Sequence, residues 1–267
     1  MAVEGNPAGS SGAGSPVIDL SGRVVVVTGG NSGIGLGIAR GVARAGGSIA
    51  IWARRSERND KAAQELRDLG ADAVGFRCDV ADEESVERCM HQTLEHFGRL
   101  DCLVANAGTS SRHAFADMPY EQWRSIVAVN LDGAFLCLRA AAAELVRQGS
   151  GGALVGVSST SAIHGAPGLE HYAASKSAVT AIMRSLAVEL ARHGVRCNTL
   201  TPGWTETELT EAARAVPNFV EVTTRRTPVR RWATLHDFEA VGAFLCDPSI
   251  TFHTGDTVVV DGGYTVF

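Results

Sequence analysis

The sequence predicts an α/β fold, a doubly wound parallel β-sheet with helices on both faces, formed by a single domain. Two observations lead to this prediction. From Arg23 onward, short apolar runs rich in β-branched residues alternate with helical patterns. Strands of parallel sheets read in this way because helices cover both of their faces. The chain has 267 residues and is 45% hydrophobic, which suffices for one large core.

The strands and helices follow one another in regular order. The predicted strands are RVVVVTGG (23–30), SIAIW (48–52), AVGFRCDV (73–80), LDCLVANAG (100–108), GALVGVSS (152–159), VRCNTLTPG (195–203) and DTVVVDGG (256–263). Helical patterns occupy 33–47, 57–70, 82–98, a long stretch near 119–147, 172–193 and 236–246. Right-handed crossovers through these helices would keep the strands parallel.

The domain is expected to span residues 18–267, with one excursion at 204–235. This excursion is long, mixed in composition and contains Pro217 and Pro228, and such segments often cover a ligand. Residues 1–17 are small and polar, without the basic start and apolar middle of a secretion signal. We therefore expect a disordered leader there.

Composition narrows the class of function. The net charge is −5 and no Lys/Arg block stands out, so nothing favours a nucleic-acid or membrane partner. No uninterrupted apolar run approaches the ~20 residues that span a bilayer. The six cysteines form no CxxC pair and no zinc-like spacing with histidine. We expect free thiols, no metal and a cytoplasmic protein.

A glycine-rich turn follows the first predicted strand. In VVVVTGGNSGIG a strand leads into a helix, and glycines let the backbone approach a pyrophosphate at the helix N-terminus. Tight turns also require glycine, so the strand–helix context carries the nucleotide interpretation. The predicted cofactor contacts in this turn are Gly29, Asn31, Ser32, Gly33, Ile34 and Gly35.

Two further strand ends fit a nucleotide laid across the sheet. Asp79 and Val80 end the third predicted strand, where a carboxylate and the backbone could meet an adenine edge. Asn106, Ala107 and Gly108 end the fourth, where small residues let a flat ring lie close. Each fragment alone is equally consistent with ordinary turn chemistry.

The end of the second strand indicates which dinucleotide is bound. A carboxylate there would hold a ribose 2′-hydroxyl and repel a 2′-phosphate. Ala53 stands in that place, followed by Arg54 and Arg55, and a guanidinium matches a phosphate well. The sequence favours NADP(H) over NAD(H), unless both arginines are only solvated residues at the strand end.

Tyr172 and Lys176 lie four residues apart on one predicted helix. Positions i and i+4 share a face, and an ammonium near a phenol lowers the phenol pKa. Such a pair can serve as a general acid and base if it faces a cleft. Ser159 follows the strand GALVGVS, and Asn130 is a polar residue within an apolar helix. Their ordinary alternatives are a capping hydroxyl and a local helix irregularity.

The motifs TGGNSGIG, CDV, NAG, VNLDGAF, SS (158–159), YAASK, RCNTLTPG and VDGG occur in one order over residues 19–264. In these motifs the chain resembles the short-chain dehydrogenase/reductase family, in its shorter single-domain subgroup. The resemblance implies a Rossmann-type fold and a homotetramer. It also implies cofactor contacts from Tyr172, Lys176, Pro202, Gly203, Trp204, Thr205 and Thr207.

By this resemblance the catalytic residues are Asn130, Ser159, Tyr172 and Lys176. Tyr172 would exchange a proton with the substrate oxygen that Ser159 holds. Lys176 would bind the nicotinamide ribose and lower the Tyr172 pKa, and Asn130 would order a water. The expected substrate contacts are Ser159, Ser161, His164, Tyr172 and Trp204, and Leu209, Phe219 and His113 are further candidates.

The leading interpretation is an oxidoreductase that transfers a hydride between NADP(H) and a small carbonyl or secondary-alcohol substrate. A non-catalytic dinucleotide sensor or scaffold is the alternative, and a tuned Tyr172 argues against it. An epimerase or dehydratase is a third possibility, although the chain has little room for an added substrate domain. Sequence alone leaves sugars, steroids, β-ketoacyl thioesters and quinones open as substrates.

Overall fold

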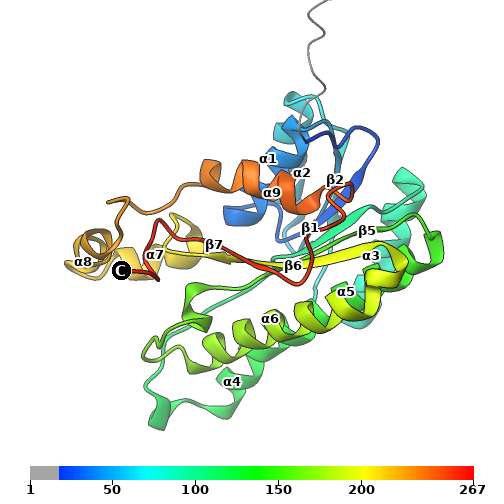
Figure 1. Ribbon diagram of the computed structural model, residues 1–267. Helices are drawn as coiled ribbons and strands as arrows, with labels where there is room; N and C mark the ends of the chain where they lie inside the picture. The colour runs from blue at the N-terminus through cyan, green and yellow to red at the C-terminus, as the bar shows by residue number, and fades with distance from the viewer. Residues whose placement is uncertain (1–17) are drawn as a thin grey trace, which may run out of the picture.

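The computed structural model describes residues 18–267, so the predicted leader lies outside the described residues. Seven parallel strands form one sheet in the order β3-β2-β1-β4-β5-β6-β7 (Figure 1). Their bounds are β1 Val24–Thr28, β2 Ser48–Ala53, β3 Ala73–Arg77, β4 Cys102–Ala105, β5 Gly152–Val157, β6 Val195–Pro202 and β7 Thr257–Val260. The order reverses between β1 and β4, where open α/β sheets form a ligand crevice.

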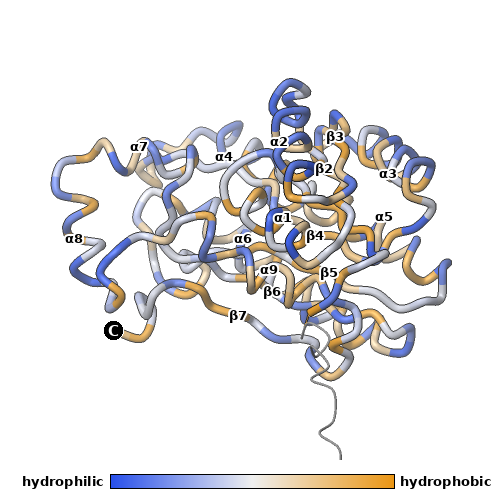
Figure 2. The backbone as a smooth tube through the Cα atoms, turned by 90° about the horizontal axis from the view of Figure 1, so that it is seen from above, coloured by the Kyte–Doolittle hydropathy of each residue, from blue (hydrophilic) through white to orange (hydrophobic). Residues whose placement is uncertain are grey.

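Helices cover both faces of the sheet, as predicted. On one face lie α1 (Gly33–Arg44), α2 (Ser56–Asp68) and α9 (Glu239–Cys246), and on the other lie α3 (Glu83–Phe97), α5 (Gly133–Gln148) and α6 (Glu170–Leu190). Each face has its own buried apolar cluster. Hydrophobic residues follow the central strands, whereas much of α2 is hydrophilic (Figure 2). The central strands β1, β4 and β5 are buried along their whole length because helices cover both of their faces.

Glycine allows α1 to pack closely against the C-terminal helices. A Cβ on Gly41 would lie 1.9 Å from the Glu239 carbonyl oxygen, and one on Gly37 would lie 2.4 Å from that of Leu235. A larger side chain at either position would force α1 away from α9. Glycine thus fixes how the last helix covers the sheet.

The predicted long helix is continuous but irregular. It comprises α4 (Tyr120–Val127), a π-helical turn (Ala128–Asp132) and α5. Together the 29 residues contain a window with a mean hydropathy of 1.6, so by length and composition this helix could cross a membrane. A core helix of a globular domain meets the same criterion, and here α5 packs against α3 and β4.

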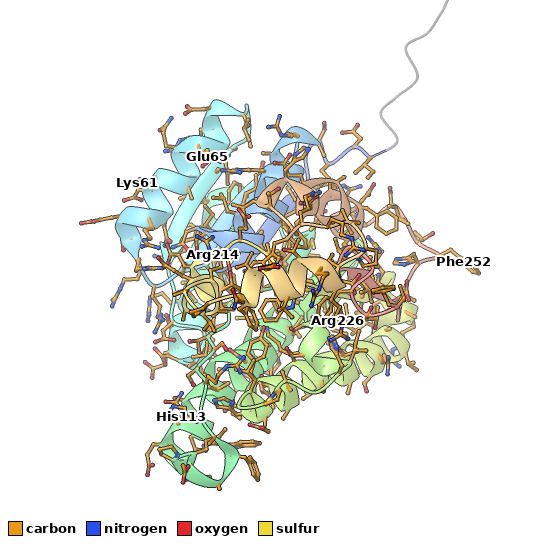
Figure 3. All side chains as sticks on the ribbon, turned by 90° about the vertical axis from the view of Figure 1, so that its left-hand side faces the viewer. Lys61, Glu65, His113, Arg214, Arg226 and Phe252 are labelled. Atoms are coloured by element: carbon orange, nitrogen blue, oxygen red, sulfur yellow. The ribbon has the colours of Figure 1, made fainter. Side chains whose placement is uncertain are left out.

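The predicted excursion forms a small helical lid, which we define as residues 204–233. It contains a 3₁₀ turn (Glu208–Thr210), α7 (Glu211–Arg214) and α8 (Phe219–Arg226). Figure 3 shows Arg214 and Arg226 on these helices and His113 on a loop at the other end of this face. Asn218 and Arg230 have left-handed backbones, with φ of 63° and 60°, a conformation that favours glycine and marks sharp turns.

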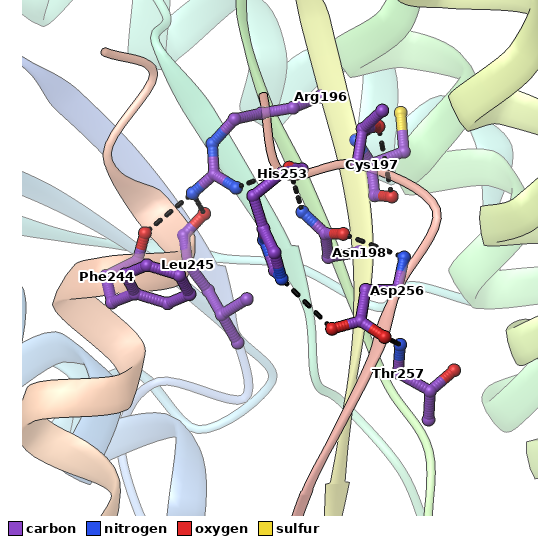
Figure 4. Close-up of polar contacts among 9 residues, drawn as sticks. Arg196, Cys197, Asn198, Phe244, Leu245, His253, Asp256 and Thr257 are labelled. Atoms are coloured by element: carbon purple, nitrogen blue, oxygen red, sulfur yellow. Dashed lines mark hydrogen bonds and ion pairs between the residues drawn. The ribbon is translucent and has the colours of Figure 1, made fainter. Parts of the chain in front are cut away.

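A buried arginine ties α9 to the sheet. The Arg196 guanidinium, on β6, donates hydrogen bonds to the carbonyl oxygens of Phe244, Leu245, Asp247 and His253 at 2.6–3.1 Å. Figure 4 shows those to Phe244, Leu245 and His253. Two of these carbonyls belong to the last turn of α9, where helical carbonyls lack partners.

The remaining short 3₁₀ helices are Phe115–Asp117, Thr160–Ala162, Ala191–His193 and Leu235–Phe238.

Candidate active site

A cavity of about 630 Å³ opens at the carboxyl ends of β1, β4, β5 and β6. Its wall is formed by the glycine turn, the loop after β4, the start of α6 and the lid. A second pocket of about 140 Å³ adjoins it and shares Gly29, Ser32, Ala107 and Gly108. The two pockets together form one elongated site across the switch point of the sheet.

Thr28 joins the two strand ends at the centre of the site. Its Oγ1 accepts hydrogen bonds from the backbone N–H groups of Asn106 and Ala107, both at 2.9 Å. Asn106 Nδ2 returns a bond to the Thr28 carbonyl oxygen at 2.8 Å. The end of β1 and the NAG segment after β4 are therefore held as one unit.

The glycine turn has no room for side chains. Gly29 and Gly33 have φ of +65° and +55°, a region that glycine adopts freely. A Cβ on Gly35 would lie 2.5 Å from Asn106 Nδ2, so Gly35 supports the turn rather than lining either pocket. A Cβ on Gly33 would lie 3.4 Å from Thr207 Cγ2, which places the lid directly over the predicted phosphate loop.

The second pocket contains the residues predicted to read the cofactor's ribose and adenine. Asn31, Ala53, Arg54, Arg55, Asp79 and Val80 all line it. Arg55 Nη2 lies 3.2 Å from Glu208 Oε2, and Arg58 also pairs with Glu208. The two guanidinium groups lower the pKa of that carboxyl. Arg54 has no ion pair among residues 18–267, so its guanidinium is available to a ligand.

Consecutive residues at the end of β5 attach α6 to the sheet. Lys176 Nζ donates to the Val157 carbonyl oxygen at 2.8 Å, and Ser158 Oγ donates to the Lys176 carbonyl oxygen at 2.9 Å. Ser159 comes next and lines the cavity with Tyr172 and Lys176. The strand end thus sets the position of the Tyr–Lys face relative to the Ser159 hydroxyl.

Burial dominates the proton affinities of this pair. Lys176 Nζ lies 5.9 Å from the centre of the Tyr172 ring, and burial lowers the pKa of Lys176 to about 8. Burial raises the pKa of Tyr172, and the Ser159 hydroxyl opposes that rise. The expected lowering by Lys176 is not the main effect in the protein alone, because removing the phenolate from water costs more.

Asn130 lies in the π-helical turn, where an irregularity was expected. Its Oδ1 accepts from the Thr109 backbone N–H at 2.8 Å, and its Nδ2 donates to the Thr109 carbonyl at 3.0 Å and to Ser175 Oγ at 3.3 Å. Asn130 therefore joins the loop after β4 to α6. A Cβ on Gly108 would be 3.4 Å from both Asn130 Oδ1 and Lys176 Nζ, so the absence of a side chain there leaves room beside the lysine.

The lid supplies an apolar wall. Trp204 stacks on Trp232 with ring centres 5.2 Å apart and meets Phe219 edge-on at 5.0 Å. Leu209, Ala213, Val216 and Phe219 line the cavity beside Trp204. The stacked rings hold the lid together. Polar lid residues also reach the cavity wall, namely Thr205, Thr207, Glu208 and Thr210.

Most of the predicted contacts converge on these two pockets, and a few do not. Ser159, Ser161, Tyr172 and Trp204 line the large cavity, as do Ile34, Lys176, Pro202, Gly203, Thr205 and Thr207. His164 does not line it, because its ring packs edge-on against Tyr264 at 5.3 Å. His113 also lies outside the lining residues.

Several cavity residues were not predicted from the sequence. They include Ser110, Ser111 and Arg112, on the loop after β4, together with Leu169 at the start of α6. The TSSRH run is polar, as surface loops usually are, so only the spatial arrangement identifies these residues. The six cysteines are free and buried, and residues 18–267 contain no cluster suited to a metal ion.

Comparison with known proteins gives consistent relatives. A sequence profile described as enoyl-(acyl carrier protein) reductase matches residues 29–265. L-rhamnose 1-dehydrogenase (NAD(P)(+)) from Sphingomonas sp. (strain SKA58) is 37% identical over 248 residues, covering 92% of this chain and 98% of the relative.

Solved structures agree along nearly the whole chain. A short-chain type dehydrogenase/reductase from Mycobacterium marinum is 34% identical, with a TM-score of 0.88 and coverage of 92% of this chain and 97% of that one. A gluconate 5-dehydrogenase from Burkholderia cenocepacia J2315, in complex with NADP and tartrate, is 33% identical. Its TM-score is also 0.88, with coverage of 93% and 97%.

Proposed function

Because the chain belongs to the short-chain dehydrogenase/reductase family, and is an NAD(P)-dependent oxidoreductase acting on CH–OH or C=O groups, we propose a more specific activity for it. We infer that it is an NADP(H)-preferring enzyme that interconverts a small polyhydroxylated ketone with its secondary alcohol, or a lactone with its lactol. The observation that carries this proposal is the convergence of Ser159, Tyr172 and Lys176 in a cavity continuous with the arginine-lined pocket.

The residues fit a nicotinamide dinucleotide. The glycine turn offers free N–H groups at the N-terminus of α1 for a pyrophosphate, and the space beside Gly108 would accept a ribose next to Lys176. When bound, the nicotinamide would supply or accept the hydride at the substrate carbon. Asp79 and Val80 would border the adenine, and Asn106 to Gly108 the flat rings.

Tyr172 is proposed as the general acid and base. The raised pKa keeps its phenol protonated near neutral pH, which suits donation of a proton to a carbonyl oxygen during reduction. Ser159 would hold that oxygen beside the phenol, and the Lys176 ammonium would stabilise the phenolate that remains. Oxidation of an alcohol requires Tyr172 to start as phenolate, so we expect it to be favoured by higher pH.

The substrate class rests on the relatives and on the polar side of the cavity. Two of the relatives are named as an L-rhamnose 1-dehydrogenase and a gluconate 5-dehydrogenase with bound tartrate. Rhamnose, gluconate and tartrate all carry several hydroxyl groups. Ser110, Ser111, Ser159 and Ser161 place four hydroxyl-bearing residues in the cavity lining. These serines support a hydroxylated substrate better than a steroid or a quinone.

The test follows cofactor oxidation or reduction across a panel of ketoses, ketoaldonates, aldoses and their alcohols. We expect Tyr172→Phe to lower kcat/KM by about 10²–10⁴-fold, the range for losing a positioned acid–base group, while the Kd for NADPH stays unchanged. Tyr120→Phe, at an exposed position, is the matched control. Near-normal turnover in Tyr172→Phe would refute the mechanism. Intact NADPH binding without turnover in the wild type would favour the sensor or scaffold alternative.

The NADP(H) preference rests on Arg54 and Ala53. Arg54→Ala should raise the KM for NADPH by about 10–100-fold, since a charge-assisted bond to the 2′-phosphate is worth roughly 1.5–3 kcal/mol. The KM for NADH should change by less than about twofold. Arg88→Ala, an exposed arginine on α3, should change neither value. Equal effects of Arg54→Ala on both cofactors would remove the basis for the preference.

We further propose a cytoplasmic homotetramer, which the family resemblance supports. Exposed apolar residues such as Phe135 on α5 and Val259 on β7 are available for contacts between subunits. Light scattering should then give a mass of four times 28.0 kDa, and a monomeric mass would contradict the assembly.

A further inference from the structure

A loop hydroxyl in the cavity is held from behind by two helices. Ser111 lines the cavity on the loop after β4. Its Oγ accepts a hydrogen bond from Gln122 Nε2 of α4 at 2.5 Å and lies 3.2 Å from His171 Nε2 of α6. The assigned mechanism uses neither Gln122 nor His171.

His171 is fully buried and immediately precedes Tyr172. Within residues 18–267, its Nδ1 has no hydrogen-bond partner, and its Nε2 is the ring nitrogen that contacts the Ser111 hydroxyl. Burial lowers the pKa of His171 and nearby His113 adds to the effect, while Glu170 and the Leu169 carbonyl oppose it. The imidazole is therefore neutral near neutral pH, with one donor and one acceptor nitrogen.

Counting hydrogen bonds leaves one site of Ser111 for a ligand. A hydroxyl has one proton and two lone pairs. Gln122 uses one lone pair, and His171 uses either the other lone pair or the proton, depending on its tautomer. In both cases the Ser111 hydroxyl keeps one hydrogen-bonding position, either its proton or a lone pair, for a ligand. The oxygen itself is already fixed in place. A preset group of this kind binds a ligand atom at little cost in side-chain entropy.

The other residues of the cavity indicate which ligand atom the Ser111 hydroxyl would bind. Ser159 and Tyr172 are already assigned to the reacting oxygen, and the lid residues Leu209, Val216 and Phe219 are apolar. The polar lid residues of the lining have other neighbours: Thr207 lies against Gly33 of the glycine turn, and Glu208 pairs with Arg55 and Arg58. Further hydroxyl groups of a substrate must turn away from the three apolar side chains, since burying them unpaired is costly. The loop after β4 is a polar wall to which they can turn.

We propose that Ser111, positioned by His171 and Gln122, binds a substrate oxygen on a carbon other than the reacting one. It thereby selects polyhydroxylated substrates over their deoxy analogues. This inference rests on the proposed function, because it names a selective contact within the same site. Ser111 would touch the substrate, whereas His171 and Gln122 act through it.

The test compares a substrate from the active panel with analogues that lack one hydroxyl at a time. For wild-type protein we expect one deoxy analogue to lose about 10–100-fold in kcat/KM, as when a single hydrogen bond to a prepared site is lost. Ser111→Ala should lose the same factor on the full substrate and almost nothing on that analogue. The selectivity ratio, which is kcat/KM on the full substrate divided by kcat/KM on the deoxy analogue, would then approach one. The change should come mainly from KM rather than from kcat.

Further variants separate positioning from folding. His171→Asn and Gln122→Leu should each reduce the selectivity ratio in part. The thermal midpoint and the Kd for NADPH are measured for every variant. Gln122→Leu provides the test if replacing the buried histidine prevents folding. Ser125→Ala removes a hydroxyl of α4 that bonds the Gln122 carbonyl at an exposed position, and it should keep the wild-type ratio.

The outcomes distinguish the two proposals. A wild-type ratio in Ser111→Ala, with the enzyme active, overturns the role of Ser111 and leaves the proposed function standing. Equal losses of kcat on both substrates also overturn it, because they indicate a structural defect. A wild-type protein inactive on every polyhydroxylated compound would overturn the proposed function and this inference together.

Discussion

At the scale of single residues, Lys176 shows how a catalytic role conflicts with stability. Its ammonium is almost fully buried, and one hydrogen bond joins it to the Val157 carbonyl. Burial lowers its pKa from 10.5 to about 8, and a shift of that size corresponds to about 3 kcal/mol between the charged and neutral forms. Charge that serves the reaction therefore weakens the fold.

We predict that Lys176→Met stabilises the protein at pH 7 while abolishing turnover. The unfolded chain binds more protons than the folded one between pH 8 and 10.5, so wild-type stability should rise with pH across this window. The gain from Lys176→Met should be about 1–3 kcal/mol at pH 7 and shrink towards pH 10.5. Urea unfolding at several pH values measures both trends.

Lys61 provides the control for this prediction. It is the only other lysine of the chain and is exposed on α2. Lys61→Met should change the free energy of unfolding by less than about 0.5 kcal/mol at every pH. A Lys176→Met variant that is no more stable than wild type at pH 7 would show that the Val157 contact offsets the cost of burial.

At the scale of elements, the active site depends on where helices are attached to the sheet. The end of β5 holds α6 through Val157 and Ser158, and the π-helical turn joins the loop after β4 to the same helix. Arg196 plays the corresponding part for α9 on the opposite face. Val157, Ser158 and Arg196 act through bonds between a side chain and the backbone, and Asn130 reaches α6 through the Ser175 hydroxyl. Directional polar contacts of this kind fix position more firmly than apolar contact alone.

Arg196→Met should lower the free energy of unfolding by about 3–5 kcal/mol, because four carbonyl oxygens would lose a charged donor in a buried site. Arg192→Met, in the 3₁₀ turn Ala191–His193 that follows α6, replaces an exposed arginine and should cost less than about 1 kcal/mol. Chemical denaturation compares the two. Similar values for both variants would mean that water satisfies the carbonyls after the substitution.

At the scale of the whole molecule, the sequence predicts the fold well because its signals are local. Each strand and helix has its own hydrophobic period, and the TGG, CDV, NAG, SS and TPG segments follow strand ends that the sheet brings to one edge. The TGG and NAG segments meet in this way, through Thr28 and Asn106. Most of the predicted cofactor and catalytic residues therefore gather in two adjoining pockets, whereas Asn130 and Gly35 lie behind the lining.

Contacts between segments far apart in the chain could not be predicted. Ser111 and His171 are 60 residues apart, and Arg55 and Glu208 are 153 apart, and no local pattern marks either pair. The pKa of Tyr172 was expected to fall because its neighbour on the helix is a lysine. It rises because burial depends on the packing of α6, β5 and the loop after β4, which spacing alone does not describe.

The strand order β3-β2-β1-β4-β5-β6-β7 also bears on how the protein is made. β2 and β3 extend the sheet on one side of β1, and β4 to β7 extend it on the other. Every strand joins an open edge, so none has to enter between two strands already paired. A chain leaving the ribosome can build the sheet in the order of synthesis. The lid residues 204–233 follow strands β1 to β6 in that order, so the cavity is enclosed only after these strands have been synthesised.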